Sequence, residues 1–155
     1  MNQPETELND ANVVDAWSRN SDPWIAAVRN REIASRALVT DAAIVEAVRD
    51  RAPRSGVDLG CGEGWLVRAL AGVEMVGVDA IPGLVGAAQA AGGGEFRVMS
   101  YEQIAAGELQ RAFDIAICNF SLIGNEAVSG LFQAAPRYLR PGGALVVQTV
   151  HPFAS

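Results

Sequence analysis

Apolar runs alternate with segments of helical periodicity through most of this chain. Nearly continuous apolar runs at 57–59, 75–78 and 113–119 are typical of strands that are buried on both faces of a parallel sheet. An alternating segment at 95–99 and a further apolar run at 144–150 predict two more strands. This order of strands and helices predicts an α/β fold: a Rossmann-like, doubly wound, mostly parallel sheet of about five strands with helices on both faces.

The helices between these strands carry their own start and stop signals. The first is predicted to open near Glu63, and a second, rich in small residues, spans 84–91. A capping box that begins at Ser100 starts a third helix. Pro136 is expected to kink or divide a fourth helix over 125–139.

The first 52 residues show helical periodicity and no strand pattern. Residues 1–9 lack periodicity and are expected to be mobile. An apolar face that includes Trp17 predicts one helix from Asp10, and the break before Pro23 starts a second. Thr40 is expected to cap a third helix. We therefore expect one domain over residues 10–155, with N-terminal helices in 10–52 and the sheet core in 55–150.

Three glycines follow the first predicted strand, in the pattern Asp58-x-Gly60-x-Gly62-x-Gly64. Glycine is needed where the backbone takes positive φ or approaches a ligand with no Cβ in the way. Between a strand end and a helix start, such a loop is an open platform for a nucleotide-like ligand. Asp79 ends the next apolar run, 19 residues after Gly60, where a ribose-binding carboxylate is expected in such folds.

The spacing of the glycines disfavours a dinucleotide. The dinucleotide pattern G-x-G-x-x-G would place its third glycine at position 65, which is occupied by Trp65. An indole there works against the close helix–strand packing that the pattern requires. An oxidoreductase that uses a nicotinamide cofactor is therefore the least favoured of the functions considered.

The glycine pattern, Asp79, the run Phe113–Asn119 and the segment Leu139–Val147 occur in an order that resembles the class I S-adenosylmethionine-dependent methyltransferases. The resemblance covers roughly residues 55–150. It implies S-adenosylmethionine as cofactor, S-adenosylhomocysteine as product and a small molecule as methyl acceptor. It also implies that Arg140-Pro141-Gly142-Gly143 turns into the last strand.

The resemblance also implies roles for individual residues. Asp79 would hold the ribose hydroxyls, Gly60 and Gly62 would admit the ribose and the methionyl part, and Asp58 would help to orient the amine. The remaining positions in the predicted cofactor site are Cys61, Ala80, Ile81, Ser100, Tyr101 and Asn119. Ala80 and Ile81 would pack on the adenine, with Ser100 and Tyr101 at its other edge.

Some of these positions carry an alternative interpretation. In the family, the place of Ser100 often holds an acidic residue that binds the adenine amino group, so Ser100 is a departure. Arg36 would reach the methionyl carboxylate through charge-assisted hydrogen bonds, with an ordinary surface arginine as the alternative. Cys61 lies at a helix start, where a thiolate could be favoured, but a small residue that fills a tight turn is the preferred interpretation. Trp17 and Trp24 are expected to pack in the core in preference to covering the cofactor.

Composition excludes several classes of function. With 155 residues, 50% of them hydrophobic, the chain can form one domain with a sizeable core. The net charge of −6 disfavours a nucleic-acid partner, because phosphate binding needs clustered positive charge. No apolar run reaches membrane-spanning length and no secretory signal stands out, so we expect a cytoplasmic protein without a membrane partner. Two cysteines provide neither a disulfide framework nor the spacing of a metal site.

The C-terminal part of the chain raises two further expectations. His151, the single histidine, follows the last predicted strand and is a weak candidate for an acceptor-side base, with a frayed terminal residue as the preferred alternative. The family's sheet adds two strands beyond the run at 144–150, so that run should have an unpaired edge. We expect self-association through this edge, or a chain that is part of a longer protein. A truncated domain that binds S-adenosylmethionine without turnover is the alternative to an active methyltransferase.

Overall fold

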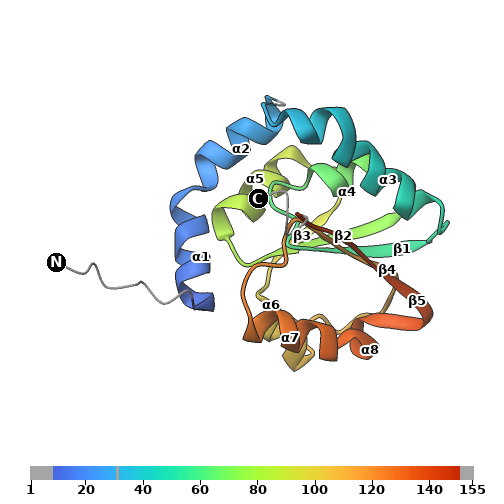
Figure 1. Cartoon of the computed structure of the whole chain (residues 1–155). Coiled ribbons are helices and arrows are strands. Elements are labelled where there is room, and N and C mark those ends of the chain that lie inside the picture. Colours follow the sequence, from blue (N-terminus) through green and yellow to red (C-terminus); the bar gives the residue numbers. More distant parts are fainter. Residues whose placement is uncertain (1–8, 31, 151–155) are drawn as a thin grey trace.

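Five parallel strands form a single sheet in the order β3-β2-β1-β4-β5 (Figure 1). The computed structural model describes residues 9–30 and 32–150. The strands are β1 (Ser55–Leu59), β2 (Glu74–Asp79), β3 (Glu95–Val98), β4 (Phe113–Asn119) and β5 (Leu139–Gln148). The chain order reverses between β1 and β4, and in such sheets a crevice opens beyond the carboxyl ends of the strands at this point. The predicted fold class is confirmed.

Helices cover both faces of the sheet (Figure 1). One face packs against α3 (Asp41–Arg49), α4 (Trp65–Ala69) and α5 (Pro82–Ala91), through side chains such as Val48, Leu66 and Val85. The other face packs against α6 (Tyr101–Ala106), α7 (Glu126–Gln133) and α8 (Ala135–Tyr138), through side chains such as Ile104 and Leu131. Because both faces are covered, the central strands are apolar on both sides, as their sequences predict.

The N-terminal helices form an arc along one side of the sheet (Figure 1). The helices α1 (Asp10–Arg19) and α2 (Ser21–Arg29) contain no buried residue. A π-helical turn, η1 (Arg36–Thr40), then leads directly into α3. Thr40 was predicted to cap α3, and this is wrong: it has helical dihedral angles and makes no capping hydrogen bond, since the helix runs through it. None of the helices within the described ranges is both long and apolar enough to cross a bilayer.

The predicted elements agree with the structure most closely where the local signal is strong. The strand β4 has the predicted bounds, and the capping box of Ser100 and Gln103 is present in full. Pro136 divides the predicted helix into α7 and α8. The helix α4 begins at Trp65 and not near Glu63, because the glycine loop continues to Gly64 at positive φ.

The last strand differs from the prediction at both ends. It begins at Leu139, not Ala144, and its regular pairing with β4 ends at Gln148. Residues 140–143, which were expected to form a turn, belong to the strand. Here the pairing of β5 with β4 shifts in register, between Phe113 and Ile115 of β4. Gly142 takes a φ of 80° there, which permits this irregularity. Among the described strands, β5 lies at the sheet edge, and self-association through that edge stays a prediction.

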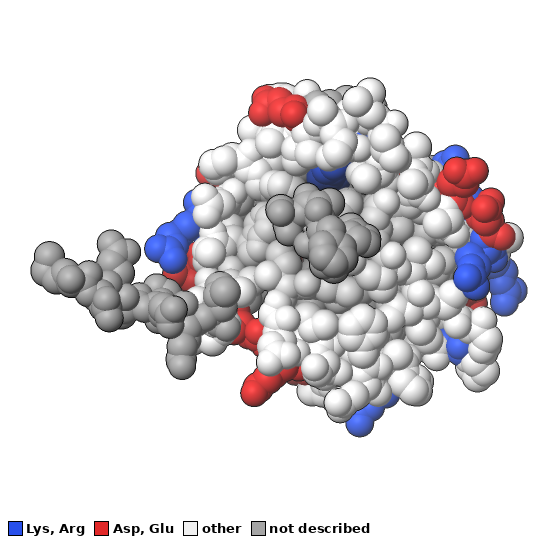
Figure 2. Space-filling model, viewed as in Figure 1, with Lys and Arg blue, Asp and Glu red and all other residues white. Residues whose placement is uncertain are grey.

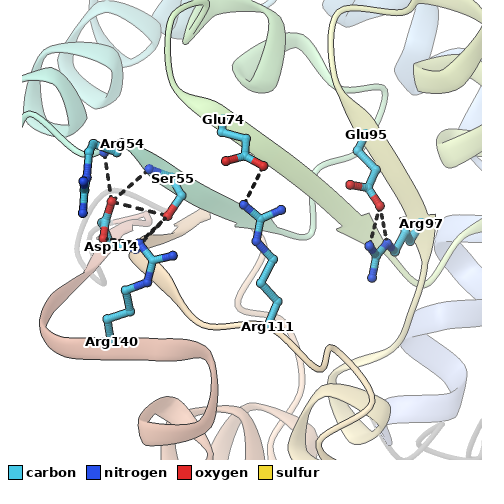
Figure 3. Close-up of polar contacts among 8 residues, drawn as sticks. All are labelled: Arg54, Ser55, Glu74, Glu95, Arg97, Arg111, Asp114 and Arg140. Carbon is cyan, nitrogen blue, oxygen red and sulfur yellow. Dashed lines mark hydrogen bonds and ion pairs between the residues drawn. The ribbon is translucent and has the colours of Figure 1, made fainter.

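A carboxylate joins three strands at the amino-terminal edge of the sheet (Figure 3). Asp114 Oδ2 accepts hydrogen bonds from the backbone N–H groups of Arg54 and Ser55, both at 3.0 Å. Its Oδ1 accepts a hydrogen bond from Arg140 Nη1 at 2.7 Å. The Arg140 hydrogen bond, followed by that of Ser55, lowers the pKa of Asp114 to about 2. Asp114 therefore has a structural role, as its place at the start of β4 predicts.

We expect Asp114→Asn to lower the melting temperature at neutral pH, because the amide loses the charge-assisted bond from Arg140. The sign of the pH dependence follows from the lowered pKa. The ionised carboxylate stabilises the fold above the ordinary pKa of 3.8, and this contribution is lost as the pH falls through about 2. The difference in melting temperature between variant and wild type, measured by circular dichroism, should therefore shrink as the pH falls from about 4 toward 2.

Asp15→Asn is the matched control, since Asp15 forms an exposed ion pair with Arg19 within α1. Exposed pairs of this kind contribute little to stability, so its melting temperature should stay close to that of the wild type. An equal loss in both variants would contradict the role assigned to Asp114.

Candidate functional site

A cavity of about 170 Å³ lies at the carboxyl ends of the strands, beneath α1 and α2. Ten residues of the predicted cofactor site line it: Arg36, Gly60, Cys61, Gly62, Asp79, Ala80, Ile81, Ser100, Tyr101 and Asn119. Asp58 is not among the lining residues, and His151 lies outside the described residues. Most of the surface visible on this face of the molecule is uncharged, and most of its acidic and basic side chains lie toward the rim, with one basic patch further in (Figure 2).

The two central glycines of the loop are required for different reasons. Gly60 has a φ of 85°, and a Cβ built on it would lie 2.4 Å from the Cβ of Ser121. Packing against the segment after β4 therefore excludes a side chain at Gly60. Gly62 has a φ of 55°, and its Cβ would meet nothing within 4 Å except Trp24 Nε1 at 3.8 Å. Gly62 thus presents bare backbone to the open space of the cavity.

Asp79 fixes the shape of this loop. Its Oδ2 accepts a hydrogen bond from the N–H of Gly62, and its Oδ1 accepts one from the N–H of Ile81, both at 2.9 Å. Burial raises the pKa of Asp79, although both hydrogen bonds act in the opposite direction. Each carboxylate oxygen can accept a second hydrogen bond. Asp79 can therefore hold the loop and bind ligand hydroxyls at the same time.

Asp58 lies behind the loop and not in the cavity wall. The residue is 2% exposed, and its Oδ1 has no hydrogen-bond partner in the part of the chain that the structure describes. Burial, and secondarily the charge of Asp79, raise the pKa of Asp58 to about 7. The Asp58 carboxyl group therefore keeps its proton to a higher pH than an exposed carboxyl group does, and a nearby cation would favour the ionised form.

Arg36 is buried, with only 8% of its surface exposed, so the surface-arginine alternative is wrong. Its Nε donates to Asp41 Oδ1 at 3.1 Å. The guanidinium lies 4.9 Å from the ring centroid of Trp65 and 5.8 Å from that of Trp24, within range of cation–π attraction. Its buried Nη2 has no hydrogen-bond acceptor among residues 9–30 and 32–150. The cavity thus contains a held cation with unused donor capacity.

The residues that follow β3 use their polar groups within the protein. The Ser100 hydroxyl accepts a hydrogen bond from the N–H of Gln103 at 3.3 Å, as the cap of α6. The Tyr101 hydroxyl donates to the carbonyl of Ser121 at 2.8 Å, with the Leu59 carbonyl at 3.3 Å. Burial raises the pKa of Tyr101, which keeps the phenol protonated. Tyr101 therefore joins the ends of β1 and β4 and lines the cavity as a neutral side chain.

Two carboxylates that the sequence interpretation missed attach the N-terminal helices. Glu63, 1% exposed, accepts hydrogen bonds from Arg29 of α2 at 3.2 Å and from Arg68 of α4 at 2.6 Å. Asp10 of α1 accepts from the N–H groups of Asn125 and Ala127 at 2.9 Å each. The pairs Glu63–Arg29 and Asp10–Ala127 are 34 and 117 residues apart in the chain, so no local pattern indicates them.

Trp17 and Trp24 also differ from the expectation that they pack in the core. Both are half-buried and line the cavity, with their rings in an edge-to-face contact at 5.2 Å. Trp24 lies over the glycine loop, with its Nε1 3.8 Å from the position that a Cβ on Gly62 would take.

Neither cysteine has a chemical role that the geometry supports. Cys61 is 4% exposed and packs against Gly77, and burial raises the pKa of its thiol. Cys118 is buried, which raises its pKa to about 12. A thiolate is disfavoured at both positions, so the preferred interpretation of Cys61 stands. Across the described ranges, no group of histidine, cysteine and acidic residues could hold a metal ion.

Comparison with known proteins gives consistent matches. A family model described as a methyltransferase domain matches residues 57–147. The ubiquinone biosynthesis O-methyltransferase of Xanthomonas oryzae pv. oryzae is 32% identical over 114 residues, which are 69% of this chain and 47% of that protein. The chain therefore spans about half the length of this curated relative.

Two solved structures extend the comparison. An S-adenosylmethionine-dependent methyltransferase from Mesorhizobium loti has a TM-score of 0.57 at 30% identity, over 69% of this chain and 53% of that chain. A TehB-like methyltransferase from Corynebacterium glutamicum has a TM-score of 0.68 over 83% of this chain and 72% of that chain, and its 19% identity shows a shared fold.

The matched family segment covers more than half of the chain and includes the glycine loop, Asp79 and β4, which together build the floor of the cavity. The resemblance to class I S-adenosylmethionine-dependent methyltransferases is confirmed, and the chain belongs to the methyltransferase-domain family.

Proposed function

We propose that this chain binds S-adenosylmethionine in the cavity and transfers its methyl group to a small molecule. One observation carries the proposal: a buried cation, Arg36, a carboxylate, Asp79, and the bare backbone of Gly62 all line the same cavity. These groups suit a ligand that carries both a carboxylate and vicinal hydroxyls. The proposal takes residues 10–155 as one methyltransferase domain.

The predicted roles fit this arrangement. Arg36 Nη2 donates to the methionyl carboxylate, and Asp79 accepts from the ribose hydroxyls while it holds Gly62. Ile81 and Tyr101 line the adenine end, where both side chains are apolar or neutral. Asp58, behind the loop, favours the cationic amine through its charge. Since the Ser100 hydroxyl caps α6, the edge of the adenine is left to backbone groups near Tyr101.

The reaction is a displacement at the methyl carbon. When bound, S-adenosylmethionine supplies an electrophilic methyl group on a positively charged sulfur. Arg36 and Asp79 would hold the cofactor while a lone pair of the acceptor takes the methyl group, which would leave the bonding pair on sulfur and release the acceptor's proton. The protein aligns the two reactants and excludes water from them. Trp17 and Trp24 contribute to this exclusion from above the loop.

The acceptor is proposed from the relatives and from the lining of the cavity. The Xanthomonas relative is an O-methyltransferase of ubiquinone biosynthesis, which makes an oxygen acceptor on a small molecule the first choice. His151 stays a prediction as an acceptor-side base. A domain that binds the cofactor without turnover is the second candidate, and a panel of small acceptors tests it against methyl transfer.

Calorimetry with S-adenosylhomocysteine and with NADH tests the proposal. The wild type should bind S-adenosylhomocysteine and not NADH. A buried carboxylate that bridges two hydroxyls contributes about 1.5–3 kcal/mol, so Asp79→Ala should weaken binding at least tenfold. Asp79→Asn keeps one acceptor oxygen but turns its NH2 group toward the N–H of Gly62 or of Ile81, so it should weaken binding as well. Unchanged affinity in Asp79→Ala, or equal binding of NADH by the wild type, would overturn the assignment.

We expect Gly62→Val to abolish this binding while the protein stays folded. The valine side chain would project into the part of the cavity where the ligand is proposed to contact the backbone of Gly62. A valine at the positive φ of this position also costs on the order of 1–3 kcal/mol in strain. Gly86→Val is the control, because Gly86 is an exposed position of α5 with open space around it. Native circular dichroism together with normal binding in Gly62→Val would show that the loop does not receive the ligand.

Binding should also release a proton near neutral pH. The amine of the ligand favours the ionised form of Asp58, whose pKa in the unliganded protein is about 7. Affinity should therefore rise with pH up to about 7 and then level off. Below its pKa, Asp58 must first lose a proton, and the free-energy cost of that step weakens binding; above the pKa this cost is absent. Calorimetry in buffers of different ionisation enthalpy measures the released proton. In Asp58→Asn both the release and the pH dependence should disappear, and their persistence would exclude Asp58 as the group responsible.

A further inference from the structure

The part of the cavity near the end of β4 is not used by the cofactor contacts proposed above. Its walls are largely apolar and come from α1, from the segment between β4 and α7, and from α7 itself: Val13, Val14, Trp17, Phe120, Ile123 and Ala127. Val14 and Ile123 are 41% and 42% exposed, so apolar surface reaches the outside of the cavity here. A surface of this kind fits a ligand whose body is apolar.

Two polar groups on this side already have partners within the protein. Both oxygens of Asp10 accept hydrogen bonds from the backbone at the start of α7, and these bonds lower its pKa. The hydroxyl of Ser121 donates to the carbonyl of Leu59 at 2.6 Å. The charge of Asp10 disfavours an anionic ligand, and the apolar walls disfavour any charged one.

Asn119 is the exception. It is the last residue of β4 and lines the cavity, and its Oδ1 is buried with no hydrogen-bond donor in the described ranges. A buried polar atom without a partner is uncommon and requires an explanation. The next residue, Phe120, has a φ of 53° and donates from its N–H to the carbonyl of Gln148 at 2.8 Å. Left-handed backbone at a non-glycine residue is strained, and such strain concentrates at functional sites.

We propose that Asn119 binds and orients the methyl acceptor, a neutral and largely apolar small molecule whose nucleophilic hydroxyl or amine donates a hydrogen bond to Asn119 Oδ1. This inference rests on the proposed function. It assigns Asn119 to the acceptor, whereas the family resemblance places it in the cofactor site. The amide is uncharged and takes no proton, so Asn119 positions the nucleophile and leaves its lone pair available for attack.

Gln148 offers a matched control. It pairs with Asn119 in the register of β4 and β5, and its Oε1 is also buried without a partner among the described residues. Unlike Asn119, Gln148 does not line the cavity. Its backbone contact with Phe120 is kept when the side chain changes. Gln148→Leu therefore removes an equivalent amide from the same end of the sheet without touching the proposed acceptor site.

The test compares phenol with anisole, which has a similar apolar body but no donor. Binding of each probe to protein saturated with S-adenosylhomocysteine is measured by NMR titration. The wild type should bind phenol about three- to tenfold more tightly than anisole, the usual effect of one hydrogen bond. This preference should vanish in Asn119→Leu and persist in Gln148→Leu, while both variants bind S-adenosylhomocysteine as the wild type does. Benzoate should bind more weakly than phenol in the wild type.

Three results would overturn the inference: no preference for phenol in the wild type, an equal loss of preference in Gln148→Leu, or weakened S-adenosylhomocysteine binding in Asn119→Leu. The last would return Asn119 to the cofactor site. If the wild type fails to bind S-adenosylhomocysteine at all, the proposed function fails first. The titration of the unliganded protein with phenol and anisole then still decides whether Asn119 selects a donor.

Discussion

The carboxylate of Asp79 connects the parts from which the cavity is made. It ends β2, and its two oxygens accept hydrogen bonds from Gly62 in the loop after β1 and from Ile81 at the start of α5. The carbonyl of Val78 accepts the N–H groups of Gly60 and the following residue, which closes the same junction. The loop therefore takes its shape only when β1 and β2 are paired in register. The open face that Gly62 presents to the cavity depends on this junction.

The cover of the cavity is attached in a different way. The helices α1 and α2 bury no residue completely, and polar contacts of Asp10 and Glu63 connect them to α7 and α4. Segments with few buried apolar contacts open at a lower free energy than the core of a sheet. The floor of the cavity is thus held by strand pairing, whereas its cover is held mainly by polar contacts.

Acidic residues at the two ends of the sheet show how environment decides the role of one side-chain type. Asp114, at the amino-terminal edge, has an arginine and two backbone donors as partners, and its pKa falls to about 2. Asp58, at the other end of the neighbouring strand, is buried near a second carboxylate, and its pKa rises to about 7. The first is a permanent charge that joins strands. The second is a buried carboxyl group whose ionised form is disfavoured by its surroundings.

Local sequence patterns were sufficient for the fold class, for the bounds of β4, for the capping box at Ser100 and for the glycine loop with Asp79. In these cases periodicity, backbone conformation and spacing depend on residues that are near in the chain. Tertiary structure alone decided that Arg36 is buried between two tryptophans, that Asp58 lies behind the loop, and that Arg140 sits within a strand. It also decided the attachment of α1 through Asp10, 117 residues from its partner Ala127. Burial and long-range partners depend on how the elements pack, and packing is not recorded in the local pattern of a sequence.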